Sequence, residues 1–150
     1  MKLLTEEIIK NFARVGRQEE SIDPLVIVKF FNPTGAGTWY ASEMYHRVLS
    51  EEGNEDDINV KDYKPEPGDE ITDTIFFGYV SIFCDFNDEW GYFSLSELEE
   101  FQGLAGLGLE RDLYAKLPRP ISEMCPKAIE GFKDMKGGEI CVQRQSEESP

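Results

Sequence analysis

The chain has little of three things that many functional classes require: histidine, closely spaced cysteines and positive charge. His46 is the one histidine among 150 residues, and Cys84, Cys125 and Cys141 have neither a Cys-x-x-Cys spacing nor a neighbouring histidine. A zinc site or a disulfide framework therefore has little support. We expect free thiols, no metal and no cofactor.

Basic residues are half as frequent as acidic ones. The chain contains 15 Lys and Arg residues and 30 Asp and Glu residues, which gives a formal charge of -15. Such a chain repels phosphate groups, so we expect no direct nucleic-acid binding and no docking to anionic membranes. A long apolar run is also lacking near the start, where residues 1–4 lead directly into Thr5-Glu6-Glu7. The sequence thus predicts no signal peptide or membrane span, and a cytoplasmic protein.

What the chain does have is enough apolar material for one core. At 150 residues and 40% hydrophobic composition it fits a single domain without disulfide support. We predict one domain over residues 1–143. The Gln-, Glu-, Ser- and Pro-rich end, residues 144–150, is expected to be a disordered tail.

Two segments carry helix signals. Thr5 is a suitable N-cap for a helix with apolar residues at helical spacing, and Gly16 is a suitable end. Ser94 and Glu97 match the S-x-x-E capping box, which predicts a short second helix that ends by Gly103. The glycine-rich residues 103–108 follow that helix and lack a lysine, so we interpret them as a turn whose leucines pack inward, not as a phosphate loop.

Strand signals come in pairs. Residues 25–31 and 38–45 flank a turn-forming segment, and residues 74–84 and 90–93 flank a polar one, so two antiparallel hairpins are expected. A further strand over residues 109–117 would place Arg111 on its apolar side. The fold class is therefore α+β: a mainly antiparallel sheet of four to five strands, built from two hairpins, with flanking helices.

Residues 51–73 differ from the rest. They contain ten carboxylates and two lysines, a net charge of 2 - 10 = -8. Proline, glycine and few apolar residues accompany this charge, so we expect a solvated, partly mobile excursion between strands. Loose binding of calcium or magnesium is an alternative, although such charge runs are usually only solvated surface.

Aromatic residues crowd the two hairpins, and both faces of the strand at residues 74–84 carry large apolar groups. Either helices cover both faces, or one face is a surface for docking another protein. For the second case the candidate binding residues are Trp39, Tyr40, Glu43, Phe77, Tyr79, Tyr92 and Arg111. An arginine on an apolar face needs a carboxylate such as Glu43 or Glu110, or else an anionic ligand.

The segments at residues 1–5, 29–31, 38–43, 76–80, 91–98 and 110–113 together resemble a small bacterial family, domain of unknown function 2958 (DUF2958), over residues 1–124. The combination of Trp39-Tyr40-Ala41, Gly91-Tyr92-Phe93-Ser94-Leu95-Ser96-Glu97-Leu98 and Glu110-Arg111-Asp112-Leu113 carries the likeness. The resemblance implies a small cytoplasmic protein often encoded on plasmids and other mobile elements. It implies no established reaction, and the acidic segment and the tail depart from the family pattern.

Three functions remain open. The leading hypothesis is a non-enzymatic accessory protein of mobile elements that binds another protein. The second is an acidic DNA mimic that inhibits a host nuclease or restriction system, which the charge of -15 motivates. The third is a small enzyme that uses Glu43, His46 and Arg111, which requires these three side chains to converge.

Overall fold

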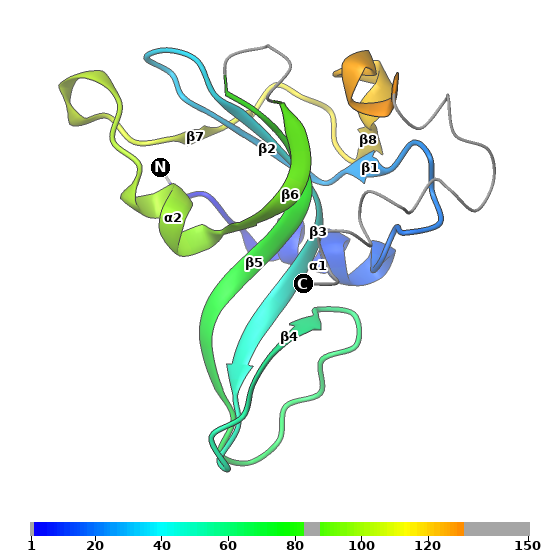
Figure 1. Ribbon diagram of the computed structural model, residues 1–150, viewed down its shortest axis with the longest axis vertical. Helices are drawn as coiled ribbons and strands as arrows, with labels where there is room; N and C mark the ends of the chain where they lie inside the picture. Colours follow the sequence, from blue (N-terminus) through cyan, green and yellow to red (C-terminus); the bar gives the residue numbers. More distant parts are fainter. Residues whose placement is uncertain (1, 83–87, 131–150) are drawn as a thin grey trace.

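The computed structural model describes residues 2–82 and 88–130 (Figure 1). Several sequence predictions fall outside these ranges: Phe83 and Cys84, most of the turn at residues 85–89, Cys141 and the tail at residues 144–150.

The first helix forms where its capping signals predict. Helix α1 (Glu6–Val15) begins after Thr5, whose hydroxyl accepts a hydrogen bond from the Ile8 N–H at 3.2 Å. It ends at Gly16, which has a φ of 70° and donates its N–H to the carbonyl of Phe12. The face of α1 that carries Phe12 packs into the core, where Phe12 is 1% exposed.

Both predicted hairpins are present and share one sheet. Its strands, within the described residues, are β2 (Val28–Phe31), β3 (Thr38–Leu49), β4 (Glu55–Asn59), β5 (Glu70–Ser81), β6 (Glu89–Ser94) and β7 (Glu110–Arg111). Strands β2 and β3 form the first hairpin, and β5 and β6 the second. The long pairing of β3 with β5 joins them in the antiparallel order β6-β5-β3-β2-β7, and β4 pairs with β3 beyond the end of β2. The α+β class and the mainly antiparallel sheet are confirmed.

The predicted strand at residues 25–31 is divided. Strand β1 (Leu25–Val26) pairs with β8 (Arg119–Pro120) in a separate two-stranded sheet, while β2 stays in the main sheet. At the division, Val26 packs into one core cluster and Ile27 into the other. The apolar run is therefore continuous because it serves both faces of the sheet.

The described part of the C-terminal half, residues 76–82 and 88–130, contains one short α-helix and three 3₁₀ turns. Helix α2 (Leu95–Glu100) starts at Ser94, whose hydroxyl accepts from the Glu97 N–H at 3.1 Å, as the capping box predicts. The 3₁₀ turns are η1 (Leu104–Gly106), η2 (Ile121–Glu123) and η3 (Pro126–Ile129).

Both faces of the sheet are buried in the body of the molecule. On one face, α1, α2 and the N-terminal segment cover a cluster in which the Phe76 ring lies 5.7 Å from Phe30 and 5.6 Å from Phe93. On the other face, η2 and η3 lie against a second aromatic cluster. There the Trp90 indole N–H donates to the Ala128 carbonyl at 2.9 Å. Two-sided burial, one of the two alternatives drawn from the sequence, is the arrangement found.

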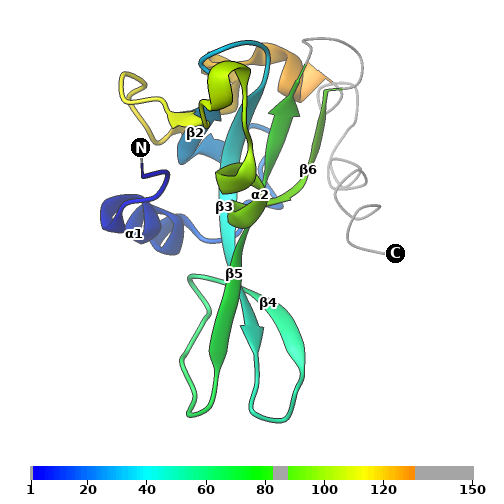
Figure 2. The ribbon, with the colours of Figure 1, turned by 90° about the vertical axis from the view of Figure 1, so that its left-hand side faces the viewer.

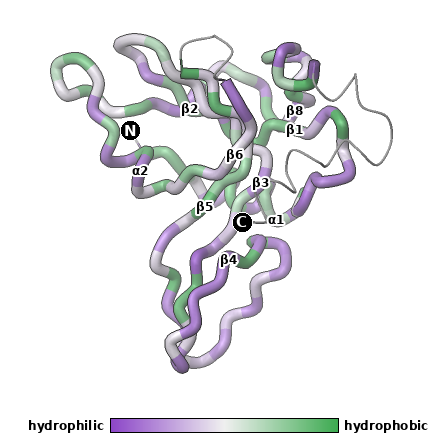
Figure 3. Tube along the Cα trace, in the orientation of Figure 1, coloured by the Kyte–Doolittle hydropathy of each residue, from purple (hydrophilic) through white to green (hydrophobic). Residues whose placement is uncertain are grey.

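Residues 51–73, here called the acidic arm, have more order than the sequence predicts. Strand β4 and the start of β5 lie within them, and they project away from the body with the end of β3 (Figures 1 and 2). The arm is solvated as expected: Asn59 is its one buried residue. Mostly hydrophilic colours along the arm contrast with the apolar centre of the body (Figure 3).

The predicted strand at residues 109–117 is mostly absent. Only β7 pairs with β2, and the chain then turns at Asp112. Arg111 pairs opposite Phe30, on the apolar side that the alternation predicts. Leu113 does not continue that side, because the turn carries it outward and leaves it 59% exposed.

Candidate functional site

The aromatic residues proposed from the sequence as a docking surface are mostly core residues. Trp39, Tyr40, Phe77 and Tyr79 are 9%, 8%, 5% and 4% exposed. Burial raises the pKa of the Tyr79 hydroxyl to about 12, so it stays protonated at neutral pH. Trp39 belongs to the core cluster on one face of the sheet, and the other three belong to the cluster on the opposite face. None of the four can reach a partner in the folded chain.

Tyr92 is the aromatic candidate that remains exposed, at 42%. Its ring lies 4.9 Å from that of Phe77 and 6.4 Å from that of Tyr45. It borders an open cavity of about 330 Å³ that Arg17, Tyr45 and Asp57 also line. Arg17 forms one wall of this cavity, with its guanidinium 5.6 Å from the centre of the Tyr45 ring.

Glu43 has a structural role. Its carboxylate is 1% exposed and accepts hydrogen bonds from the Gln18 N–H at 2.6 Å and from the Tyr45 hydroxyl at 2.5 Å. The side-chain amide of Gln18 in turn donates to the backbone carbonyls of Leu25 and Ser42. This network fastens the segment after α1 to the bulge in β3, and it satisfies a buried charge by hydrogen bonds.

The three residues of the enzyme hypothesis do not form one site. Glu43 shares a strand face with its hydrogen-bond donor Tyr45, while His46 follows Met44 on the opposite face. Arg111, at the sheet edge, donates from Nη1 to the Lys2 carbonyl at 2.6 Å, instead of pairing with Glu43. In the described ranges, moreover, no three His, Cys, Asp or Glu residues come together as metal ligands would.

A different set of residues is presented to solvent. The large hydrophobic side chains that are exposed in the described parts of the chain are Ile22, Ile71, Tyr92, Leu104, Leu107, Leu113 and Tyr114. The last four flank β7 in sequence and are 72%, 52%, 59% and 95% exposed. Leu107 and Leu113 are six residues apart, which limits their Cα separation to about 20 Å. We call Leu104, Leu107, Leu113 and Tyr114 the apolar rim.

The loop that carries Leu104 and Leu107 is held by hydrogen bonds. The Gly103 N–H donates to the Leu107 carbonyl at 2.7 Å, and the Leu104 N–H donates to the Thr34 hydroxyl at 3.0 Å. That hydroxyl donates to the Asn32 side chain at 2.8 Å, within the turn between β2 and β3. The leucines that we expected to pack inward are therefore fixed in an outward position.

The turn that carries Leu113 and Tyr114 is fixed in a similar way. One carboxylate oxygen of Asp112 accepts from the Tyr114 N–H at 2.9 Å and the Ala115 N–H at 3.0 Å, and the other lies 3.3 Å from the Lys29 ammonium. Burial acts to raise the pKa of this carboxyl, but the two N–H groups and Lys29 outweigh it and hold the pKa below its ordinary value. Asp112 is thus ionised at neutral pH and stabilises the turn.

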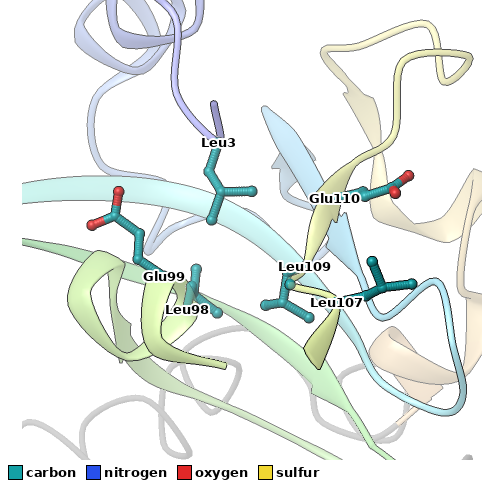
Figure 4. A pocket seen from close by; sticks show the side chains of 7 residues that line it. Leu3, Leu98, Glu99, Leu107, Leu109 and Glu110 are labelled. Atoms are coloured by element: carbon teal, nitrogen blue, oxygen red, sulfur yellow. The ribbon is translucent and has the colours of Figure 1, made fainter. Parts of the chain in front are cut away.

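Next to Leu107 lies a groove of about 430 Å³, lined by Leu3, Leu98, Glu99, Leu107, Gly108, Leu109 and Glu110 (Figure 4). Its apolar base comes from three separate parts of the chain: Leu3, Leu98 and Leu109 are 6%, 3% and 5% exposed. The carboxylates of Glu99 and Glu110 stand on opposite sides of these leucines. The groove therefore combines an apolar base with negative charge at its edges.

Sequence reasoning missed this site because leucine is ordinarily a core residue. A signal was present: residues 103–108 contain two leucines and three glycines, and they come directly after an acidic helix. A loop so short cannot bury every leucine, since its backbone must also remain solvated or hydrogen-bonded.

Comparisons with known proteins place the chain in a family without adding an activity. No curated protein and no solved structure matches it. Neither helix in residues 2–82 and 88–130 has the length and apolar character that crossing a bilayer requires. The family model described as protein of unknown function (DUF2958) matches residues 3–50 and 66–131, and so extends beyond residue 124 and omits most of the acidic arm. All residues of the groove and the apolar rim fall within this match, and the chain belongs to the DUF2958 family.

Proposed function

We propose that this chain is a non-enzymatic binding protein that docks another protein through the apolar rim and the adjacent groove, as an accessory protein of mobile elements. The observation that carries the proposal is the 95% exposure of Tyr114 on a turn fixed by Asp112. An exposed tyrosine on a rigid backbone loses little conformational entropy on binding, and tyrosine is enriched among residues that dominate interface energies.

The fixed loops support binding over simple tolerance of exposed leucines. Scattered surface hydrophobics are normal, but these four residues occur within an eleven-residue stretch, 104–114, in two loops that are each hydrogen-bonded. Preorganised loops increase affinity because the backbone does not have to be ordered during binding. An open groove beside Leu107 gives a partner a recess for an anchoring side chain.

Site-specific photo-crosslinking in the organism that encodes the chain tests the proposal. Tyr114→p-benzoylphenylalanine and Leu107→p-benzoylphenylalanine should each crosslink the same partner protein. The matched control is Ile71→p-benzoylphenylalanine, because Ile71 is 47% exposed but lies in the acidic arm. Crosslinks that are absent at 107 and 114, or equal at 71, would overturn the proposal.

The variant Asp112→Ala tests how much the fixed turn contributes to binding, apart from the contacts made by Leu113 and Tyr114. The substitution leaves Leu113 and Tyr114 in place but removes the acceptor that fixes their turn. Binding of the captured partner should weaken several-fold, mainly through faster dissociation.

The DNA-mimic hypothesis stays as a second candidate because the arm is more ordered than the sequence predicts. A mimic needs carboxylates on fixed elements, and Glu55, Asp56 and Asp57 lie on β4, which pairs with β3. A basic partner captured by such a mimic should be released by duplex DNA and lost when these three residues become Gln, Asn and Asn. If neither duplex DNA nor the three substitutions release the partner, the DNA-mimic hypothesis is wrong.

A further inference from the structure

The groove of Figure 4 has a chemistry that selects among protein partners. Its base is built from Leu3, Leu98 and Leu109, and Leu107 forms a half-exposed rim at 52%. A volume of about 430 Å³ lies within the usual range of ligand clefts, about 300–1,000 Å³. The groove can therefore enclose an apolar side chain together with part of the backbone that carries it.

The two charged side chains that line the groove, Glu99 and Glu110, are both acidic. Residues 95–110 contain Glu97, Glu99, Glu100 and Glu110 and no lysine or arginine. Glu99 comes from α2 and Glu110 from β7, and their carboxylates lie on opposite sides of the leucines (Figure 4). Within the part of the chain that the structure describes, neither carboxylate forms an ion pair. A cation placed between them would gain attraction from both sides.

We infer that the groove binds a basic, leucine-bearing segment of the partner protein. The leucine side chain packs on Leu3, Leu98 and Leu109, while a lysine or arginine near it in the segment lies between Glu99 and Glu110. This inference rests on the proposed function and specifies the partner's chemistry. An acidic segment is disfavoured by charge repulsion, and a second copy of this chain, with its charge of -15, is a poor source of the required cation.

Synthetic peptides test the inference without knowledge of the partner. The probe is acetyl-Leu-Lys-Leu-Lys-Leu-amide, titrated to millimolar concentration into the intact ¹⁵N- and methyl-labelled chain. Resonances of Leu98, Leu107 and Leu109 should shift. The peptides with every Lys replaced by Glu, or with every Leu replaced by Ser, should bind at least about tenfold more weakly.

Matched variants distinguish the effect of the carboxylates that line the groove from the effect of the chain's overall negative charge. The double variant Glu99→Gln, Glu110→Gln should weaken binding of the Lys-Leu peptide about tenfold, with a smaller effect at high salt. Glu100→Gln is the control, since it removes the same charge from the same helix but from a residue outside the groove lining. It should change the affinity less than about twofold.

The outcomes distinguish the inference from the proposed function. Equal binding of the Lys and Glu peptides, shifts confined to other residues, no shift at millimolar peptide, or equal effects of the double variant and Glu100→Gln would each overturn the inference. A crosslinked partner at residues 107 and 114 whose contact segment is acidic would also overturn it, while leaving the proposed function intact. Specific peptide binding without any crosslinked partner would support the groove chemistry and contradict the proposed function.

Discussion

The acidic arm and the body of this molecule share two continuous strands, yet they are stabilised in different ways. Strands β3 and β5 run from the body into the arm, and each has 12 residues. Every buried hydrophobic side chain in the described ranges lies outside residues 51–73, whereas the arm buries only Asn59. Backbone pairing, with apolar support only from Val48 of β3 and the partly buried Val60, therefore continues the sheet where the main core has ended.

This difference separates the residues that stabilise the fold from the acidic arm, and the surface proposed for recognition lies with the former. Residues 51–65, most of the arm, lie outside the family match, while the groove and the apolar rim lie inside it. In the proposed function the body holds its exposed leucines on a rigid frame, and its two-sided aromatic core provides that frame. The arm adds charge but only Val60 to the packing around the core, so changes at its other positions should have small effects on the stability of the whole chain.

The largest expected effect comes from the centre of the body. Phe76 is 0% exposed and packs against the rings of Phe12, Phe30 and Phe93. Phe76→Ala should lower the free energy of unfolding by about 3–5 kcal/mol, because it removes buried area and leaves a cavity. Ile71→Ala, at an arm position that is 47% exposed, should change it by less than about 1 kcal/mol.

Urea denaturation followed by circular dichroism measures both variants. If Phe76→Ala does not fold, Phe76→Leu gives a milder version of the same comparison, at about 1 kcal/mol. Equal losses for the body and arm variants would show that the arm is part of the cooperative core.

The sequence predicts those parts of the fold that depend on local signals. Thr5, Gly16 and Ser94 fix the ends of the helices through their own backbone hydrogen bonds, and the two hairpins follow from apolar runs divided by turn residues. Strand β4 was not predictable, because Glu55-Asp56-Asp57 has no strand composition. It forms because β3 extends beyond β2 and offers residues 45–49 as a partner.

The candidate site was less predictable than the fold. The aromatic residues that suggested a surface are needed for the core, since a sheet covered on both faces requires large side chains on both. The outward position of Leu104 depends on a hydrogen bond to Thr34, which is 70 residues away in sequence. No local pattern contains such a contact.

The next largest effect on stability is expected from glycine substitutions, which compare the backbone of the body with that of the arm. A Cβ at Gly78 would lie 1.8 Å from the Tyr40 carbonyl oxygen in the neighbouring strand, so Gly78→Ala forces β3 and β5 apart. We expect a loss of about 3 kcal/mol or more. Gly53 in the arm has a φ of 93° but open space around it, so Gly53→Ala should lose only about 1 kcal/mol through backbone strain. Thermal unfolding of both variants measures the difference, and a larger loss for Gly53→Ala would contradict it.

His46 makes the junction of arm and body sensitive to pH. Its ring packs against Tyr63 of the arm at 5.2 Å, its neighbours across the strands are Ile58 and Thr74, and its Nδ1 has no hydrogen-bond partner. Burial lowers the pKa of His46 below its ordinary value of 6.5. The unfolded chain therefore binds the proton more readily, and the free energy of unfolding should fall as the pH drops below about 6.5.

His46→Gln tests this pH dependence directly, because the chain contains one histidine. The variant should lose most of the decrease in urea midpoint between neutral pH and pH of about 5, a range in which unperturbed carboxylates remain largely ionised. Amide exchange in β4 should report the loosening in the wild-type chain first. An unchanged pH profile in the variant would assign the effect to carboxylates instead.

The smallest expected effect is that of the ion pair between the strands of the arm. Arg47 donates from Nε and Nη2 to both carboxylate oxygens of Asp57, at 2.9 and 3.1 Å, and the two side chains are 36% and 37% exposed. A double-mutant cycle of Arg47→Ala and Asp57→Ala should give a coupling energy of about 0.5–1 kcal/mol that shrinks with added salt. A coupling above about 2 kcal/mol would mean that the arm is held by its charges, and that its independence from the core is only apparent. The expected small value would instead assign the order of β4 to backbone pairing with β3, with Arg47 and Asp57 contributing mainly to its register.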